Sequence, residues 1–176
     1  REDVFLTTKV WKTSLEPDQV HSTTRSALKA LGTDYVDLLL IHGPNRSVPI
    51  PETIRAMNEL QRTGAVRHIG VSNFSVSQLR TAQDASQTPI VTNQVEYHPR
   101  KRQDALLEVV LEEDLLLTAY SPLAKGALVD EPRRADIGKR YDRTASQVAL
   151  RWLVQQPNVI TIPKAADRDH RYENSR

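Results

Sequence analysis

The stretch DYVDLLLIHGP, from Asp34 to Pro44, decides how the rest of this sequence is interpreted. Its centre is an apolar run that is typical of a strand buried on both faces, as in a parallel sheet covered by helices. A strand of that kind has no need of a histidine, yet His42 follows the run directly and is itself followed by Gly43. We therefore expect the role of His42 to lie beyond the strand.

Short apolar segments alternate with longer amphipathic segments along the whole chain. This regular alternation implies parallel strands joined by right-handed crossovers, which leaves a doubly wound open sheet or a (β/α) barrel. We expect strands at residues 4–10, 36–42, 67–73, 92–98, 115–122 and 159–165; helices at residues 16–32, 51–64, 75–86, 103–114 and 144–156; a looser segment at 123–136; and a polar tail that can form a helix.

The residues at the ends of the expected strands favour the barrel. A dinucleotide-binding doubly wound sheet would place a glycine-rich turn after its first strand, and no G-x-G-x-x-G occurs in the sequence. In a barrel, the carboxyl ends of all strands meet at one face, where catalytic loops lie. Any one of these strand-end residues has an ordinary structural explanation, but their coincidence does not. They are Lys9, His42, Ser72 with Asn73, Gln94, Tyr120 with Ser121, and Lys164.

Composition limits the class of protein. With 176 residues, 39% apolar and 26% charged, the chain is expected to form one soluble globular domain over residues 1–176. The absence of cysteine excludes disulfides, thiolate nucleophiles and cysteine-rich zinc sites, and cytoplasm is the default location. We predict no metal site. The opening segment lacks the features of a signal peptide, and no apolar run is long enough to span a membrane.

The charges also limit the partners. The formal net charge of +2 comes from interleaved basic and acidic residues. The densest basic cluster, PRKRQD at residues 99–104, is short and lacks aromatic neighbours for base stacking, so a nucleic-acid partner is not expected. No apolar helical stripe is left over after a barrel has been covered, which favours a monomer.

Six segments resemble, in order and spacing, the signature segments of the aldo-keto reductases, which are (β/α)8 barrels that use NADPH. The segments are LTTKV, TDYVDLLLIHGP, GAVRHIGVSNF, NQVEYHP, LTAYSPLAKG, and VITIPKA followed by EN. The resemblance implies an oxidoreductase that transfers a hydride from NADPH to the carbonyl of a small aldehyde or ketone and so yields an alcohol. It covers essentially the whole chain.

The resemblance assigns a role to each matching position. Lys9 and His42 match the lysine and histidine of a catalytic tetrad that also contains an aspartate and a tyrosine acid. An ammonium favours a neighbouring phenolate, and an imidazole orients the carbonyl. The implied cofactor contacts are Ser72, Asn73 and Gln94 with the nicotinamide carboxamide, Tyr120 with its ring, Ser121 and Leu123 with the pyrophosphate, Lys164 and His170 with the 2′-phosphate, and Glu173 and Asn174 with adenine.

The sequence departs from the family pattern at several of these positions. Gly43 stands where an aromatic residue is usual, so one wall of the substrate pocket, which we expect Trp11 and Gly43 to border, is open or rebuilt. Ala165 replaces a usual serine and His170 a usual arginine, which weakens recognition of the 2′-phosphate. NADPH is the expected cofactor, and NADH is the alternative.

The sequence begins at the third strand of the family pattern. A whole barrel of this kind needs about 250 residues. We therefore expect about six of the eight β/α units, in a barrel that is incomplete at its N-terminal side. The tetrad aspartate and tyrosine have no counterpart here, so we expect the 176-residue chain by itself to be a poor reductase.

Two other function classes remain open. A lysine at the end of a barrel strand can form a Schiff base, so Lys9 could serve an aldolase that needs no nicotinamide. Alternatively, the chain could belong to a regulatory barrel that binds the nucleotide without turnover, since fold does not fix activity. Borohydride trapping on Lys9 would favour the first alternative, and nucleotide affinity without turnover would favour the second.

Overall fold

The structure is a computed structural model, and it describes residues 1 and 3–176. The strands are β1 (Thr7–Val10), β2 (Val36–Ile41), β3 (Val66–Ser72), β4 (Ile90–Glu96), β5 (Leu116–Tyr120) and β6 (Val159–Thr161). The helices are α1 (Pro17–Leu31), α2 (Ile50–Arg62), α3 (Val76–Ala85), α4 (Asp104–Glu112), the short 3₁₀ turn η1 (Ala124–Gly126), α5 (Pro132–Lys139), α6 (Ala145–Val154) and α7 (Arg168–Asn174). The expected alternation of strands and helices is confirmed.

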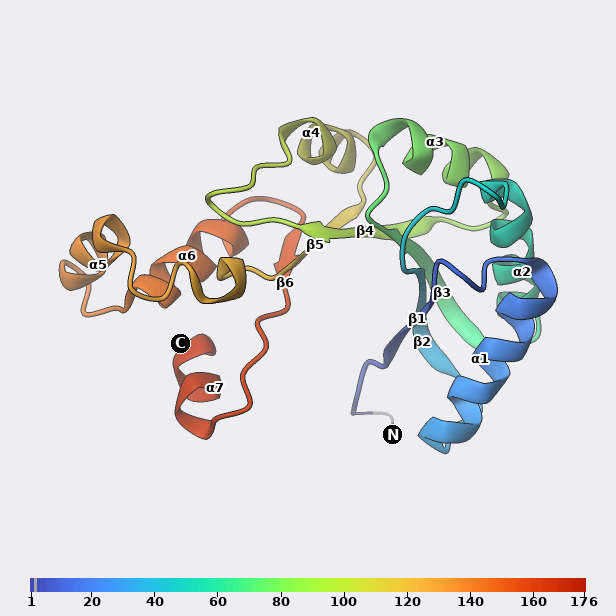
Figure 1. Ribbon diagram of the computed structural model, residues 1–176, viewed down its shortest axis with the longest axis horizontal. Helices are drawn as coiled ribbons and strands as arrows, with labels where there is room; N and C mark the ends of the chain where they lie inside the picture. The colour runs from blue at the N-terminus through green and yellow to red at the C-terminus, as the bar shows by residue number, and fades with distance from the viewer. Residues whose placement is uncertain (2) are drawn as a thin grey trace. The chain divides into compact units, whose positions relative to one another are not determined.

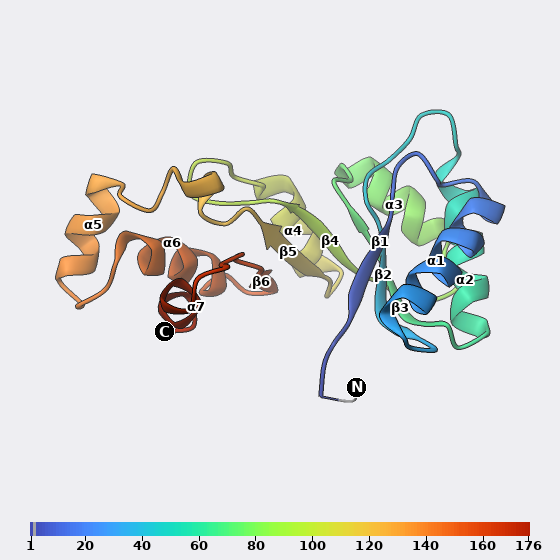
Figure 2. The same cartoon turned by 60° about the horizontal axis from the view of Figure 1, so that its bottom comes forward.

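The strands form one sheet in which neighbours follow chain order from β1 to β6. The pairs β1·β2, β2·β3 and β5·β6 are all parallel. Residue contacts divide the chain into two compact units, residues 1–93 and 94–176. In the first unit, α1, α2 and α3 lie on the same side of β1, β2 and β3 (Figures 1 and 2).

Strand β2 forms the centre of the first unit. All six of its residues are buried, which confirms the prediction of a strand that is covered on both faces. The helices of the same unit have buried residues of their own, including Val20 of α1 and Met57 of α2. A fully buried aliphatic side chain contributes about 1.5–3 kcal/mol, so this strand is a major source of the unit's stability.

Asp37 is the one charged residue within β2, and it is held by several partners. Its carboxylate accepts hydrogen bonds from the backbone N–H of Leu6, at 2.8 Å, and from the guanidinium groups of Arg1 and Arg67, at 2.7 and 3.0 Å. These partners, Leu6 foremost, hold the pKa of Asp37 below its ordinary value. The same two guanidinium groups lie 4.2 and 4.0 Å from the centre of the Tyr35 ring, so this tyrosine belongs to a structural cluster.

Several predicted boundaries are wrong in detail. Strand β1 begins at Thr7 rather than at Val4, and the side chains of Val4 and Phe5 are exposed. The segment expected to be loose, residues 123–136, contains η1 and the first half of α5. Glu131 precedes α5 and its side chain accepts a hydrogen bond from the backbone N–H of Arg134, so a side-chain cap starts a helix with little apolar periodicity.

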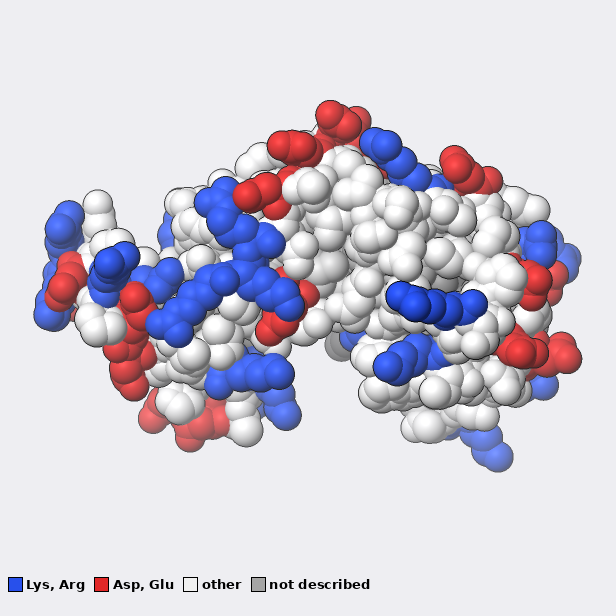
Figure 3. All heavy atoms as spheres, turned by 45° about the horizontal axis from the view of Figure 1, so that its top comes forward, with Lys and Arg blue, Asp and Glu red and all other residues white. Residues whose placement is uncertain are grey.

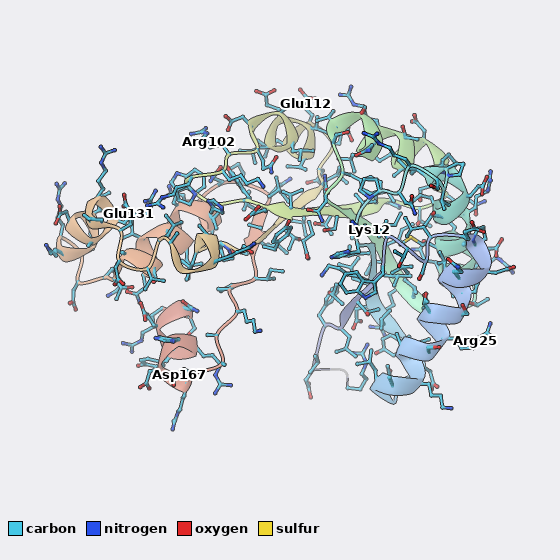
Figure 4. The ribbon with its side chains drawn as sticks, in the orientation of Figure 1. Lys12, Arg25, Arg102, Glu112, Glu131 and Asp167 are labelled. Carbon is cyan, nitrogen blue, oxygen red and sulfur yellow. The ribbon has the colours of Figure 1, made fainter. Side chains whose placement is uncertain are left out.

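In the second unit, α6 and α7 are joined by side-chain contacts. Thr144 and Gln147 form a capping box at the start of α6. The Thr144 hydroxyl also donates to the carboxylate of Glu173, and the Gln147 amide donates to the backbone oxygen of Glu173 at 3.1 Å. These bonds fix α7, the helix that Asp167 caps at its start (Figure 4).

Charged side chains of both signs appear on the visible face of each unit (Figure 3). Among the described residues, no helix is both long and apolar enough to cross a bilayer. The same part of the chain contains no group of three or more potential metal-ligating side chains of His, Cys, Asp or Glu.

Candidate functional site: two clusters at strand ends

In the first unit, the parallel register brings Lys9 and His42 together. Lys9 of β1 pairs with Leu40 of β2, and the backbone N–H of His42 donates to Val10 at 2.9 Å. His42 follows the last residue of β2 directly, as expected. Both side chains are half-buried, and burial lowers the pKa of the Lys9 ammonium. A cation and an imidazole therefore lie side by side at the ends of two adjacent strands.

The surroundings of His42 favour a neutral imidazole. Burial, followed by the positive charges of Lys9 and Lys12, lowers the pKa of His42. Lys12 lies in the loop after β1 (Figure 4). The ring nitrogen Nδ1 of His42 is buried and has no hydrogen-bond partner in the described part of the chain. This leaves Nε2 as the ring nitrogen that a ligand can reach.

Trp11 and Gly43 flank the same imidazole. The Trp11 and His42 rings lie 4.2 Å apart between centroids, at an interplanar angle of 59°. Trp11 is 64% exposed, and its ring forms an apolar wall beside His42. A Cβ placed on Gly43 would meet its nearest neighbour, Asn73, only at 3.9 Å, so there is room where the family resemblance expects an aromatic side chain.

Ser72 and Asn73 complete this first cluster. Ser72 is the last residue of β3 and is buried, whereas Asn73 has a left-handed backbone with φ of 60°. The Asn73 amide Nδ2 donates to the backbone oxygen of His42 at 2.9 Å and to Ser72 Oγ at 3.2 Å. The end of β3 is thus tied directly to the end of β2.

Asn93 of β4 is a residue of this cluster that sequence reasoning missed. It is fully buried, and its side chain binds both backbone groups of Phe74: Nδ2 donates to the carbonyl at 2.9 Å, and Oδ1 accepts from the N–H at 3.4 Å. Its place beside Gln94 in NQVEYHP was the only available signal, and that signal does not reveal a partner 19 residues away.

In the second unit, a cleft of about 590 Å³ gathers six of the predicted cofactor residues. The cleft lies between the segment after β5 and the segment that runs from β6 into α7. Positive φ angles at Ser121 and Ala124 turn the chain sharply after β5. The predicted residues that line the cleft are Ser121, Leu123, Lys164, His170, Glu173 and Asn174.

The cleft is suited to an anion. Lys125, which sequence reasoning did not single out, lines it together with Lys164. The two acidic residues at its edge are engaged elsewhere: the Asp167 carboxylate accepts from the backbone N–H groups of Asp169 and His170, and the Glu173 carboxylate accepts from Thr144. The backbone bonds hold the pKa of Asp167 below its ordinary value. A phosphorylated ligand would therefore meet two ammonium groups there.

Gln94 and Tyr120 are not among the residues that line this cleft. Gln94 is buried and lies two residues before the end of β4, rather than at the strand end as expected. Tyr120 is the last residue of β5 and is half-buried, and its backbone oxygen accepts from Tyr97 at 3.4 Å. Lys164 follows β6 by three residues instead of ending it.

Each of the two clusters suits a chemical group of its own. The first cluster offers side-chain amide and hydroxyl groups at Ser72 and Asn73, which suit a carboxamide. The second offers a cleft within the range of about 300–1,000 Å³ that is usual for small-molecule sites, with cations at its rim.

Comparison with known proteins gives one consistent result. The model of the Aldo/keto reductase family matches residues 1–176. The chain is 39% identical over 180 residues to the glyoxal reductase of Bacillus subtilis (strain 168), covering 99% of this chain and 63% of that protein. It spans about three fifths of the length of the curated relatives it matches.

Solved structures agree. A thermostable aldo-keto reductase, Tm1743, in complex with the inhibitor epalrestat, superposes with a TM-score of 0.95 at 43% identity, covering 99% of this chain and 66% of that one. An aldo/keto reductase from Klebsiella pneumoniae in complex with NADP and acetate gives a TM-score of 0.90 at 30% identity, covering 99% and 64%. With every segment from Arg1 to Arg176 matched, this chain belongs to the aldo/keto reductase family, as its six signature segments predict.

Proposed function

We propose that residues 1–176 form the cofactor-binding and carbonyl-binding part of an NADPH-dependent reductase of small aldehydes or ketones. The observation that carries this proposal is the cleft of the second unit. Six residues chosen from the sequence as nucleotide contacts line one cavity, and one of them, Lys164, joins Lys125 in offering ammonium groups that suit phosphate. The NADP in the Klebsiella pneumoniae relative, and the name of the Bacillus subtilis glyoxal reductase, support the same cofactor and substrate class.

Each residue then has a task that its chemistry permits. Ser72, Asn73 and Gln94 hold the carboxamide and so choose which face of the ring meets the substrate, while Tyr120 supports the opposite face. Lys164, Lys125 and His170 receive the 2′-phosphate and pyrophosphate with Ser121 and Leu123, and Glu173 and Asn174 border adenine. Trp11 and Gly43 border the space for the carbonyl substrate.

Reduction requires a hydride at the carbonyl carbon and a proton at the oxygen. A bound reduced nicotinamide supplies the hydride. The neutral imidazole of His42 hydrogen-bonds to the carbonyl through Nε2 and orients it, and the Lys9 ammonium stabilises negative charge at the oxygen. Tyr35, the one tyrosine among residues 1–93, stands at the opposite end of β2, about 20 Å of strand away from His42, and is covered by arginines.

We infer that Tyr35 does not donate this proton, and that the 176-residue chain by itself is a nucleotide binder with little reductase activity. Isothermal titration calorimetry separates binding from turnover. We expect the 176-residue chain to bind NADPH, and 2′,5′-ADP to compete for the same site. Lys164→Ala should weaken both by roughly tenfold to hundredfold, since a hydrogen bond to a charged group contributes about 1.5–3 kcal/mol. No binding of either nucleotide would overturn the proposal.

A Schiff-base aldolase is the second candidate, because burial lowers the pKa of Lys9 and so makes the free amine more accessible. Borohydride trapping in the presence of a small aldehyde separates the two. A covalent adduct confined to Lys9, without NADPH binding, would favour the aldolase. Turnover of glyoxal with loss of NADPH absorbance, measured on the whole gene product, would favour the reductase. Nucleotide binding by that product without turnover would favour a regulatory barrel.

A further inference from the structure

The loop that follows β3 is held in place by a side chain from another strand. Backbone pairing in β3 ends at Ser72, and the chain then passes through Asn73 in a left-handed conformation. At the next residue, the side-chain amide of Asn93 forms hydrogen bonds with both the N–H and the carbonyl of Phe74. The side chain of Asn93 thus binds the backbone two residues beyond the end of β3.

A side-chain amide can serve both backbone groups at once, because it carries a donor and an acceptor at fixed spacing. Asn93 and Phe74 are both almost fully buried, at 0% and 2% exposure, so water cannot replace a lost bond. If the amide were removed, Phe74 would keep two buried, unpaired polar groups, and the loop would have to move to satisfy them.

Such a movement would reach the first cluster. Asn73 immediately precedes Phe74, and its own amide supports the carbonyl of His42 and the hydroxyl of Ser72. A rotation of the Asn73–Phe74 peptide would therefore displace the carboxamide contacts and the backbone next to the imidazole together. Asn93 is not itself one of the proposed ligand contacts, although it directly precedes Gln94 in β4; its hydrogen bonds to Phe74 fix the loop that carries Ser72 and Asn73.

We infer that Asn93 is a positioning residue, which holds Ser72 and Asn73 in the arrangement that recognises the nicotinamide carboxamide. This inference rests on the proposed function and deepens it. If it is correct, replacing Asn93 weakens the binding of the nicotinamide end of the cofactor specifically. A purely structural role would weaken the binding of every nucleotide equally.

The test compares NADPH with its 3-acetylpyridine analogue, which has a methyl group in place of the carboxamide NH₂. Calorimetric titration is carried out on the whole gene product with Asn93→Leu and with Asn93→Ser, which leaves a small hydroxyl if the leucine variant fails to fold. We expect NADPH affinity to fall by about tenfold to hundredfold and analogue affinity by less than about threefold. Combining either variant with Ser72→Ala should add little, because both act on the same contact.

Asn58→Leu provides a matched control. Asn58 is also a buried asparagine of the first unit, and its amide binds Gln61, Ser86 and Thr88, away from both clusters. Its loss should leave the ratio of the two affinities unchanged. Equal losses for both nucleotides in the Asn93 variants, or the same ratio as in Asn58→Leu, would overturn the inference while the proposed function stands. A wild-type protein that binds neither nucleotide would refute the proposed function, and the inference with it.

Discussion

Replacing Gly70 by alanine should destabilise the first unit through steric overlap alone. Gly70 pairs with Leu40 of β2 and faces Thr92 of β4. A Cβ at this position would lie 2.7 Å from Leu40 Cδ2 and 2.9 Å from the Thr92 backbone oxygen. Carbon atoms in favourable contact are about 3.5–4.0 Å apart, so the neighbours must move by several tenths of an ångström.

Neither neighbour can move freely. Leu40 is fully buried, and the Thr92 oxygen belongs to the backbone of the adjacent strand. Overpacking of this kind costs about 1–3 kcal/mol. For a chain of this length, that corresponds to a fall in Tm of about 2–4 °C per kcal/mol. Urea denaturation followed by circular dichroism would measure the free energy of unfolding, with an unchanged m-value if the denatured state is unaffected.

Gly43→Ala is the matched control, because Gly43 is also buried and follows the neighbouring strand. Its added Cβ would meet atoms only at 3.9 Å, which is an ordinary contact. We expect its stability to change by less than about 0.5 kcal/mol. Equal losses in the two variants, or a loss below about 0.5 kcal/mol for Gly70→Ala, would refute the reasoning about close packing between β2, β3 and β4.

Three further predictions concern charge and capping. Asp37→Asn should lower the free energy of unfolding at neutral pH. Because folding depresses the pKa of Asp37, its carboxylate contributes fully to stability above about pH 4 and less as the pH falls further. The urea midpoints of variant and wild type should therefore converge in acid. Lys12→Gln should raise the pKa of His42, since one repelling cation is removed; an NMR titration that shows a fall or no change would contradict this. Thr144→Val should lower the free energy of unfolding by about 1–2 kcal/mol, because α6 loses its cap. Amide hydrogen exchange in α7 should also accelerate, because Glu173 loses a partner. Unchanged exchange would mean that other contacts hold α7.

Much of the fold could be predicted because burial leaves a pattern in the sequence. The apolar run of β2 required cover on both faces, and Pro17 and Gly32 marked the ends of α1. Helix α5 was missed because its sequence, PRRADIGK, has no apolar stripe; a proline in the first turn and the side-chain cap of Glu131 define its start. The length of β1 was overestimated because Val4 and Phe5 are apolar yet exposed, and hydrophobicity alone does not distinguish a buried apolar residue from an exposed one.

Some residues of the candidate site could also be predicted from the sequence, and others could not. Lys9, His42, Ser72 and Asn73 end strands, and the topology of parallel strands brings such ends together, so their proximity was predictable. Asn93 was not, since its function depends on a contact with the backbone of a residue far away in the sequence, and an asparagine inside a strand has no periodic signature. Lys125 was not singled out either, because its place in the cleft depends on the positive φ angles of the turn after β5.

The backbone conformation of Asn73 limits which amino acids can occupy this position. A φ of 60° is readily tolerated by glycine, asparagine and aspartate, whereas β-branched side chains are strained there. Glycine has no group to reach the His42 carbonyl, and aspartate has no N–H to offer it. A saturation library at this position, selected for ligand binding, should therefore return asparagine alone.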